Sequence, residues 1–253
     1  MCLILFAWRV HPRFPLVVAA NRDEFFARPT AAAAFWHDRP GLLAGRDLEA
    51  GGTWMGITHR GRFAALTNYR DPGHQKAGRP SRGLLVADFL HSPAPAHDTL
   101  LGLAAQGAAC NGYNLLAGDS RALYWGSNIT GELRELPPGL YGLSNHLLDT
   151  PWPKVDAGRT ALAAALPALP DLGPLFDLLA DDRIFPDERL PATGVPLDWE
   201  RRLSAAFIRS PDYGTRCSTA LAVGADGTVM FEEQTWLRHD GRGERRRFRF
   251  QSQ

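Results

Sequence analysis

The sequence contains few cysteines and carries almost no net charge. Its 253 residues include three cysteines, Cys2, Cys110 and Cys217, which are widely spaced and form no CxxC pair. This spacing argues against a disulfide framework or a zinc site and is typical of proteins from a reducing compartment. The 28 Lys and Arg residues balance 27 Asp and Glu residues to a net charge of +1. So small a charge gives no global attraction to nucleic acid or to an acidic membrane.

Long hydrophobic runs are also missing. The apolar stretch from Leu3 to Trp8 ends at Arg9, which is too early for the hydrophobic region of a signal peptide. No later stretch approaches the length of a transmembrane helix. The sequence therefore predicts a soluble, cytoplasmic protein with no membrane span, no nucleic-acid partner and no metal site.

Short apolar segments are present instead, separated by turn residues. Segments 3–8 and 15–20 flank a proline-containing turn, and residues 53–68 form a second hairpin pattern. Periodicity predicts helices over 83–90, 97–106, 154–166, 173–181 and 197–208, strands within 113–145 and 218–236, and a final edge strand in the arginine-rich tail around Phe248 and Phe250. Helices grouped in blocks indicate an α+β fold in one domain spanning 1–253. Two stacked, mainly antiparallel sheets with helices on both outer faces, an αββα sandwich, satisfy this order.

The second residue is a candidate nucleophile. Residue 2 is small, so Met1 can be removed, which would leave Cys2 with a free α-amine. A terminal amine, with a pKa of about 8, can act as the base for its own side-chain nucleophile. If amine and thiol are coupled, we expect Cys2 to alkylate below the pH that an ordinary thiol requires. The alternative is a cysteine that fills a small gap in the core.

Four polar residues, Asn21, Arg22, Asp23 and Glu24, directly follow the second predicted strand. An anionic Asp23 near the Cys2 amine would hold its hydrogen atoms in place and tune its pKa. The other three are candidates for contacts with a substrate. The same tetrapeptide could also be a charged turn that ends a hairpin.

Three further polar residues lie at strand ends. Asn68 ends the fourth predicted strand and Asn145 ends a later one, and each amide could donate to a developing oxyanion. Turn formation is the alternative role for both asparagines. Arg216 begins a strand and could pair with Asp23 or with a substrate carboxylate.

Several stretches together resemble one known family. MCLILFAW, VVAANRDEFFARPT, GGTWMGIT, FAALTNYRD, GYNLLAGD, GLSNHLLDTPWPK and YGTRCST are similar to segments of the NRDE family, which includes the transport and Golgi organisation proteins. That family in turn resembles N-terminal-nucleophile hydrolases of the penicillin V acylase and bile salt hydrolase type. The resemblance runs through nearly the whole chain and implies the αββα sandwich. It also implies that Cys2 is the nucleophile, that Asp23 contacts its amine, and that Asn68, Asn145 and Arg216 complete the site.

One position departs from the acylase pattern. The acylases carry an arginine three residues before the aspartate, where this chain has Ala20. Arg22 is the neighbour of Asp23, and in a continued strand we expect it to point to the other sheet face than that arginine.

Two functions are therefore expected. The first is hydrolysis of a linear amide or thioester through an acyl-transfer step on Cys2. The second is a non-catalytic carrier of haem, acyl-CoA or lipid on the same fold, since NRDE-family proteins are associated with haem and lipid trafficking. No cofactor is expected beyond a carried haem, whose axial ligand could be Cys2, His11, His59, His74 or His146. Cys110 and Cys217, which apolar stretches flank, are expected in the core.

Overall fold

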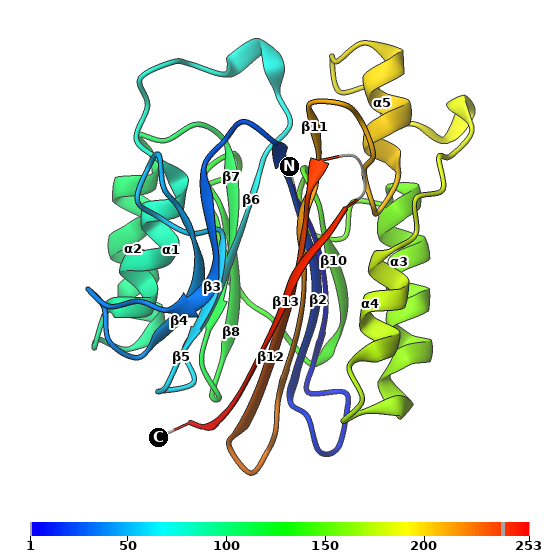
Figure 1. The fold of residues 1–253 in the computed structure, drawn as a ribbon. Coiled ribbons are helices and arrows are strands. Elements are labelled where there is room, and N and C mark those ends of the chain that lie inside the picture. Colours follow the sequence, from blue (N-terminus) through cyan, green and yellow to red (C-terminus); the bar gives the residue numbers. More distant parts are fainter. Residues whose placement is uncertain (1, 239–240, 253) are drawn as a thin grey trace.

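Two antiparallel β-sheets pack face to face in the computed structural model, which describes residues 2–238 and 241–252 (Figure 1). In sheet A the strands lie in the order β10 (Gly139–Leu143), β1 (Cys2–Trp8), β2 (Leu16–Phe25), β11 (Tyr213–Val223), β12 (Thr228–Trp236) and β13 (Arg242–Gln251). In sheet B the order follows the chain: β3 (Thr30–Phe35), β4 (Leu42–Asp47), β5 (Met55–Thr58), β6 (Phe63–Asn68), β7 (Tyr113–Gly118), β8 (Leu123–Ser127) and β9 (Glu132–Glu135).

Helices cover the outer faces of both sheets. The α-helices are α1 (Arg82–His91), α2 (Ala96–Gly107), α3 (Pro153–Ala165), α4 (Gly173–Leu179) and α5 (Leu197–Ser204), and short 3-10 turns occur at η1 (Pro72–His74), η2 (Leu166–Ala168) and η3 (Asp187–Arg189). Figure 1 shows α1 and α2 against sheet B, and α3 and α4 against sheet A. The predicted α+β fold, an αββα sandwich, is confirmed. No helix in the described part of the chain is long and apolar enough to cross a membrane.

The alternation of side chains along β1 explains why the whole strand is buried. Ile4 and Phe6 point into the layer between the two sheets, whereas Leu3 and Leu5 point toward α3 and α4. A strand that has a second sheet on one side and helices on the other must be apolar at every position. Each such fully buried side chain stabilises the fold by about 1.5–3 kcal/mol. Cys2 shares the parity of Ile4, so its side chain faces the layer between the sheets.

Most of the predicted elements are confirmed, and three details differ. The hairpins β1–β2, β5–β6 and β11–β12 form as expected, and β13 is an edge strand whose Phe248 and Phe250 pack between the sheets. The sequence analysis missed β3 and β4, because the alanine-rich segment TAAAAF has little intrinsic strand preference. It also placed β10 in a continuous meander, but β10 pairs with β1 in the other sheet.

The third difference concerns α5, which ends at Ser204 instead of continuing to Ile208. The Ala206 carbonyl accepts a hydrogen bond from the Asn21 side chain, and the Ile208 N–H donates to Thr215 Oγ1. These partners on sheet A hold the backbone in a non-helical path. Tertiary hydrogen bonds therefore override the apolar periodicity of this segment.

Candidate active site

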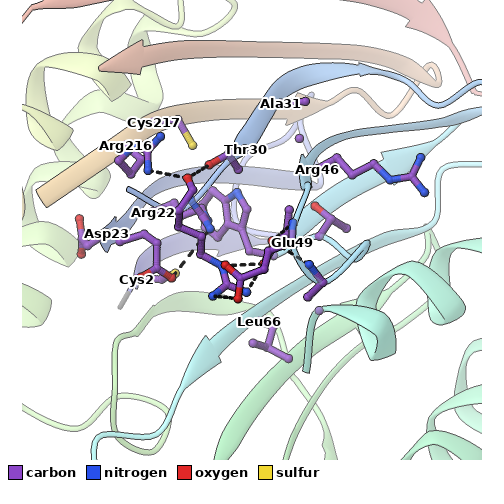
Figure 2. Close-up of a pocket in the computed structure, with 18 of the residues that line it drawn as sticks. Cys2, Arg22, Asp23, Thr30, Ala31, Arg46, Glu49, Leu66, Arg216 and Cys217 are labelled. Carbon is purple, nitrogen blue, oxygen red and sulfur yellow. Dashed lines mark hydrogen bonds and ion pairs between the residues drawn. The ribbon is translucent and has the colours of Figure 1, made fainter. Parts of the chain in front are cut away.

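A cavity of about 600 Å³ lies between the two sheets and is open to solvent. Cys2, Arg22 and Cys217 of sheet A line it on one side, and Asn68 of sheet B and Arg82 of α1 line it on the other. Its size is typical of sites that bind small molecules. Figure 2 shows the labelled side chains around this space.

A row of side chains across three strands forms one wall of the cavity. In the antiparallel register, Cys2 of β1 and Cys217 of β11 are both partners of Arg22 on the central strand β2. Register partners in adjacent strands share a sheet face. The side chains of Cys2, Arg22 and Cys217 therefore stand side by side on the face toward sheet B.

This register corrects the expected orientation of Arg22. Ile4 is the partner of Ala20, as Cys2 is of Arg22, and both pairs belong to the inner face of sheet A. Ala20 and Arg22 are two residues apart, so a continued strand gives them the same face and not opposite ones. Arg22 thus presents its guanidinium on the same sheet face as Ala20.

The Cys2 thiol is buried at the start of β1. Ser144 Oγ donates a hydrogen bond to the Cys2 carbonyl at 3.2 Å, which fixes the strand end against β10. Burial raises the pKa of the Cys2 thiol above its ordinary value, Asp23 adds to the rise, and Arg22 opposes it. The resting thiol is therefore protonated at neutral pH and needs a base during attack. The expectation that Cys2 alkylates below the pH of an ordinary thiol applies to a chain with a free Cys2 amine, and it stays a prediction.

Asp23 lies beside the cavity at the next position of β2 and is almost fully buried. Thr215 Oγ1 donates to its Oδ1 at 2.8 Å, and the Tyr213 hydroxyl donates to its backbone carbonyl at 3.2 Å. Burial raises the pKa of the Asp23 carboxyl, while Lys154 and the Thr215 hydrogen bond lower it. Thr215 of β11 thus orients the carboxylate, and Tyr213 of the same strand holds the backbone of Asp23.

Lys154 is a residue of the site that the sequence analysis missed. It lies in the first turn of α3, is buried, and donates from Nζ to the Leu203 carbonyl at 2.8 Å. Burial lowers its pKa to about 8, and the neighbouring Asp23 opposes that shift. No local sequence signal distinguishes this lysine from a solvent-exposed one at a helix start.

The two candidate asparagines occupy different places. Asn68 lines the cavity at the end of β6, and its side-chain amide makes no hydrogen bond to any described residue. Asn145 is fully buried behind it and donates from Nδ2 to the Asn68 carbonyl at 2.9 Å, while its own carbonyl accepts from Arg70 N at 2.7 Å. Asn145 is not among the cavity-lining residues. It positions Asn68, and Asn68 alone offers its amide to a ligand.

Arg216 reaches the cavity because of a β-bulge. Thr215 pairs with Asp23 and Cys217 pairs with Arg22, so Arg216 is the extra residue in β11. Its Nη1 donates to the carbonyls of Phe25 and Arg28, at 2.7 and 3.1 Å. The expected pairing with Asp23 is not what the structure shows; Arg216 braces the turn between β2 and β3.

The remaining residues of the NRDE tetrapeptide divide between two faces. Asn21 points away from the cavity: its amide donates to the carbonyls of Leu179 and Ala206, and its Oδ1 accepts from Ser218. It therefore ties the helical layer to sheet A and does not face a substrate. Glu24 does line the cavity, and its Oε1 accepts a hydrogen bond from the next residue's N–H.

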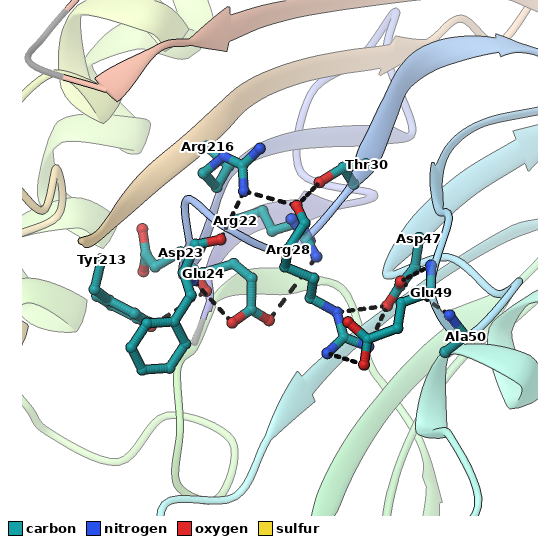
Figure 3. A network of polar contacts seen from close by, with 11 residues as sticks. Arg22, Asp23, Glu24, Arg28, Thr30, Asp47, Glu49, Ala50, Tyr213 and Arg216 are labelled. Atoms are coloured by element: carbon teal, nitrogen blue, oxygen red, sulfur yellow. Dashed lines mark hydrogen bonds and ion pairs between the residues drawn. The ribbon is translucent and has the colours of Figure 1, made fainter.

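Ion pairs line another part of the cavity wall. Arg28 contacts Asp47 at 2.8 Å and Glu49 at 3.4 Å, which links the β2–β3 turn to the end of β4 (Figure 3). Across the cavity, the backbones at Gly52 and Gly83 approach so closely that a Cβ on Gly52 would lie 2.4 Å from the Gly83 carbonyl carbon. Glycine at this contact lets the loop before α1 bring Arg82 to the wall.

The remaining cysteines and the histidines differ in whether they line the cavity. Cys110 packs in the core against α1 and α2, as expected. Cys217 is also buried, as expected, but in addition it lines the cavity. Of the proposed haem ligands, only Cys2 is a cavity-lining residue among those described. The His146 ring forms hydrogen bonds with the hydroxyl groups of Tyr69 and Thr150, and the His59 ring stacks on Phe35. Within the described ranges, no group of His, Cys, Asp or Glu side chains is arranged to hold a metal ion.

Comparisons with known proteins agree with the sequence resemblance. The model of the family "Transport and Golgi organisation 2" matches residues 1–238. The chain is 40% identical to a Transport and Golgi organization protein 2 homolog of Bos taurus and 36% identical to that of Homo sapiens, over 95% of each chain in both cases. Among solved structures it is similar to a Caenorhabditis elegans N-acylethanolamine-hydrolyzing acid amidase ortholog, at 12% identity and a TM-score of 0.48, covering 87% of this chain and 92% of the other. The family match and the extent of identity show that this chain belongs to the Transport and Golgi organisation 2 family.

Proposed function

We propose that this protein is a cysteine hydrolase that cleaves a linear amide or thioester through an acyl-enzyme on Cys2. The observation that carries the proposal is the meeting of two groups in one cavity. The Cys2 thiol comes from sheet A, and the unengaged amide of Asn68 comes from sheet B. A nucleophile and an oxyanion donor facing the same space are the minimum that acyl transfer requires.

The reaction begins after removal of Met1, when the Cys2 amine is free. The amine accepts the thiol proton, and Sγ attacks the carbonyl carbon, so a C–S bond forms and the carbonyl oxygen becomes an oxyanion. Asn68 donates a hydrogen bond to that oxyanion. When the intermediate collapses, the protonated amine returns its proton to the leaving nitrogen or sulfur. Water, deprotonated by the same amine, then cleaves the acyl-enzyme and releases the acid.

Asp23 and Lys154 support this cycle from behind the nucleophile. An ionised Asp23 stabilises the ammonium form of the terminal amine at the moment when that amine has taken the thiol proton. Lys154 lowers the pKa of the buried Asp23 carboxyl and so favours its ionised form. Thr215 fixes the direction of the carboxylate. Both Lys154 and Thr215 are therefore positioning residues.

The test compares wild type with Cys2→Ala, using Cys217→Ala as the matched control in the same row. We expect wild type and Cys217→Ala to hydrolyse members of a panel of acyl amides and acyl thioesters, and Cys2→Ala to be inactive. If wild type is no faster than Cys2→Ala on the whole panel, the hydrolase proposal is wrong.

The second candidate function is carriage of haem, acyl-CoA or lipid without turnover. The observation that favours it is the size and openness of the cavity, which suits a bound ligand whether or not it reacts. Of the haem ligands considered, Cys2 alone has direct access to that space. A carrier would copurify with its ligand and retain its affinity in the Asn68→Ala variant, because it has no oxyanion to stabilise.

A further inference from the structure

Arg22 holds a buried positive charge that the protein leaves incompletely paired. Its side chain is 9% exposed, and its Nη1 has no hydrogen-bond partner among the described residues. The carboxylate nearest to it, Glu24, lies 3.9 Å from Nη2, which is beyond hydrogen-bond distance. Buried charged donors are normally satisfied, because leaving them unpaired is energetically costly. An open donor of this kind on a cavity wall indicates that a ligand supplies the partner.

The neighbours of Arg22 do not compete for this donor. On either side of it in the sheet stand Cys2 and Cys217, whose burial keeps both thiols protonated at neutral pH. Glu233, the other buried acid on this wall, accepts a hydrogen bond from Ala33 N at 2.6 Å and interacts with Cys217. Glu24, Asp23 and Glu233 therefore act on Arg22 through space, but among the described residues none of these carboxyl groups accepts a hydrogen bond from its guanidinium.

A second guanidinium extends the positive region. Arg216 lines the same cavity, and within the described part of the chain its side chain contacts the carbonyls of Phe25 and Arg28 and the ring of Phe26, not a carboxylate. Figure 3 shows Arg216 and Arg22 on neighbouring strands, next to the ion pairs of Arg28. Arg28 differs from both, because Asp47 and Glu49 neutralise it.

We propose that Arg22, assisted by Arg216, binds a carboxylate of the substrate within a few bonds of the carbonyl that Cys2 attacks. This inference rests on the proposed hydrolase function. Cys2 and Arg22 are register partners, whose Cα atoms are about 4.5–5.5 Å apart in adjacent strands, and the Arg22 charge lowers the pKa of the Cys2 thiol. An anion on Arg22 is therefore close to the reacting carbon. Phosphates at the far end of a thioester carrier are too distant from the thioester to fill this position.

Two substrate classes meet this requirement. In an N-acyl α-amino acid the carboxylate belongs to the leaving group, and in a monoamide of a short diacid it belongs to the acyl group. The experiment measures kcat/KM for N-decanoylglycine, for the succinic acid monoamide of decylamine, and for the neutral amide N-decanoylethanolamine. We expect wild type to prefer at least one of the acids over the neutral amide by about 10- to 100-fold, the range for a hydrogen-bonded charge.

Arg22→Met is the informative variant, and Arg46→Met is its control. Methionine has a length similar to that of arginine, so Arg22→Met removes the guanidinium and keeps most of the bulk of the side chain. Arg46 lines the same cavity, but both of its terminal nitrogens bind Asp38, at 2.6 and 2.8 Å, and Figure 2 shows its guanidinium turned away from Cys2. The preference for the acid should fall to about threefold or less in Arg22→Met and persist in Arg46→Met. If Arg22 acts only on the reactivity of the thiol, the substitution changes kcat/KM for all three substrates by the same factor. The ratio of kcat/KM between the acid and the neutral amide then stays the same.

The failure of this inference differs from the failure of the hydrolase proposal. If the neutral amide is cleaved as fast as both acids, or if Arg22→Met keeps the preference, the carboxylate site is wrong and the hydrolase stands. If nothing is cleaved, the hydrolase proposal fails, and the site is tested by calorimetric binding of the same compounds to Cys2→Ala. The site is supported if Cys2→Ala binds an acid more tightly than the neutral amide and Cys2→Ala/Arg22→Met does not. Equal affinities of Cys2→Ala for the acids and the neutral amide overturn it.

Discussion

Cys2 and Cys217 flank the same arginine on the same face of the same sheet, yet their chemical surroundings differ. Cys2 begins β1, with its carbonyl held by Ser144 and with Asn68 across the cavity. Cys217 lies inside β11, after a bulge. Its thiol donates a hydrogen bond to the buried carboxyl group of Glu233. Burial raises the pKa of both thiols, and beside Cys217 the Glu233 carboxylate raises it further.

The comparison shows that access to the cavity does not make a nucleophile. A buried protonated thiol reacts only if a base beside it accepts the proton in the transition state. Cys2 acquires such a base from its own amine when Met1 is removed, and Asp23 lies nearby to support the resulting charge. Cys217 is inside the chain and has a carboxylate that disfavours its thiolate. The predictions below separate these two environments.

The largest expected effect is the loss of activity on removing the first thiol. Cys2→Ala should lower kcat by about 10⁴- to 10⁶-fold, as is typical for loss of a covalent nucleophile. Cys217→Ala should change kcat by less than about threefold, because Cys217 has no terminal amine beside it to accept its proton and takes no part in the proposed reaction. Initial rates on the best amide or thioester of the panel measure both. Comparable decreases in kcat in the two variants would contradict the different roles assigned to the two cysteines.

The next effect concerns the donor that faces Cys2 from the other sheet. Asn68→Ala should lower kcat by about 10²- to 10³-fold with little change in ligand affinity, because the amide acts on the oxyanion of the transition state. Single-turnover rates and equilibrium binding to the variant separate the two quantities. If affinity falls as much as the rate, Asn68 binds the ground state and is not an oxyanion donor.

A smaller effect should appear in the pH dependence of stability, through Lys154. The folded protein releases the Lys154 proton near pH 8, whereas an unfolded lysine keeps it until about pH 10.4. The unfolded state therefore binds more protons between these values, and the contribution of Lys154 to the free energy of unfolding rises with pH, by up to about 3 kcal/mol.

Lys154→Met should remove this rise. Urea unfolding of wild type and Lys154→Met at pH 7.5, 9 and 10 gives the free energy of unfolding of each protein, and the difference between the two should grow with pH. Lys76, the only other lysine of the chain, lies exposed in a loop, and Lys76→Met serves as the control. Identical pH slopes for wild type and Lys154→Met would show that Lys154 is not buried as described.

The smallest effect is a difference in alkylation between the two thiols. At each pH, Cys2 should react with iodoacetamide about tenfold faster than Cys217, because burial raises the pKa of both and Glu233 raises that of Cys217 further. Both rates should rise with pH, because the thiolate is the reacting form. Arg22→Met should slow Cys2 at neutral pH, since Arg22 lowers the Cys2 pKa. Peptide mass spectrometry at timed intervals gives the rates, and equal rates would contradict the description of the two sites.

The sequence predicts the parts of this site that lie at the ends of regular strands. Cys2 directly precedes an apolar segment, and Asp23 and Asn68 lie at the ends of two others, so their meeting in one cavity follows once the strands pair as hairpins. The αββα layering follows in the same way from segregated helices and apolar strands.

Other features depend on contacts between distant segments and carry no local signal. A one-residue bulge in β11 decides where Arg216 and Cys217 point, and nothing in YGTRCST marks the extra residue. Lys154 is buried only because α3 packs against sheet A near Asp23. Asn145 has the spacing of a site residue but uses its amide to hold the Asn68 backbone.

The central claim, that Cys2 is an N-terminal nucleophile, is tested most directly by trapping its acyl-enzyme. Natively expressed protein is mixed with a thioester substrate, quenched in acid within one turnover, and digested for peptide mass spectrometry. The account predicts an N-terminal peptide that begins at Cys2 and carries the acyl group on sulfur, with no acyl group on the Cys217 peptide. A chain that retains Met1 while hydrolysing substrate, or an acyl group found on Cys217 and not on Cys2, would contradict it.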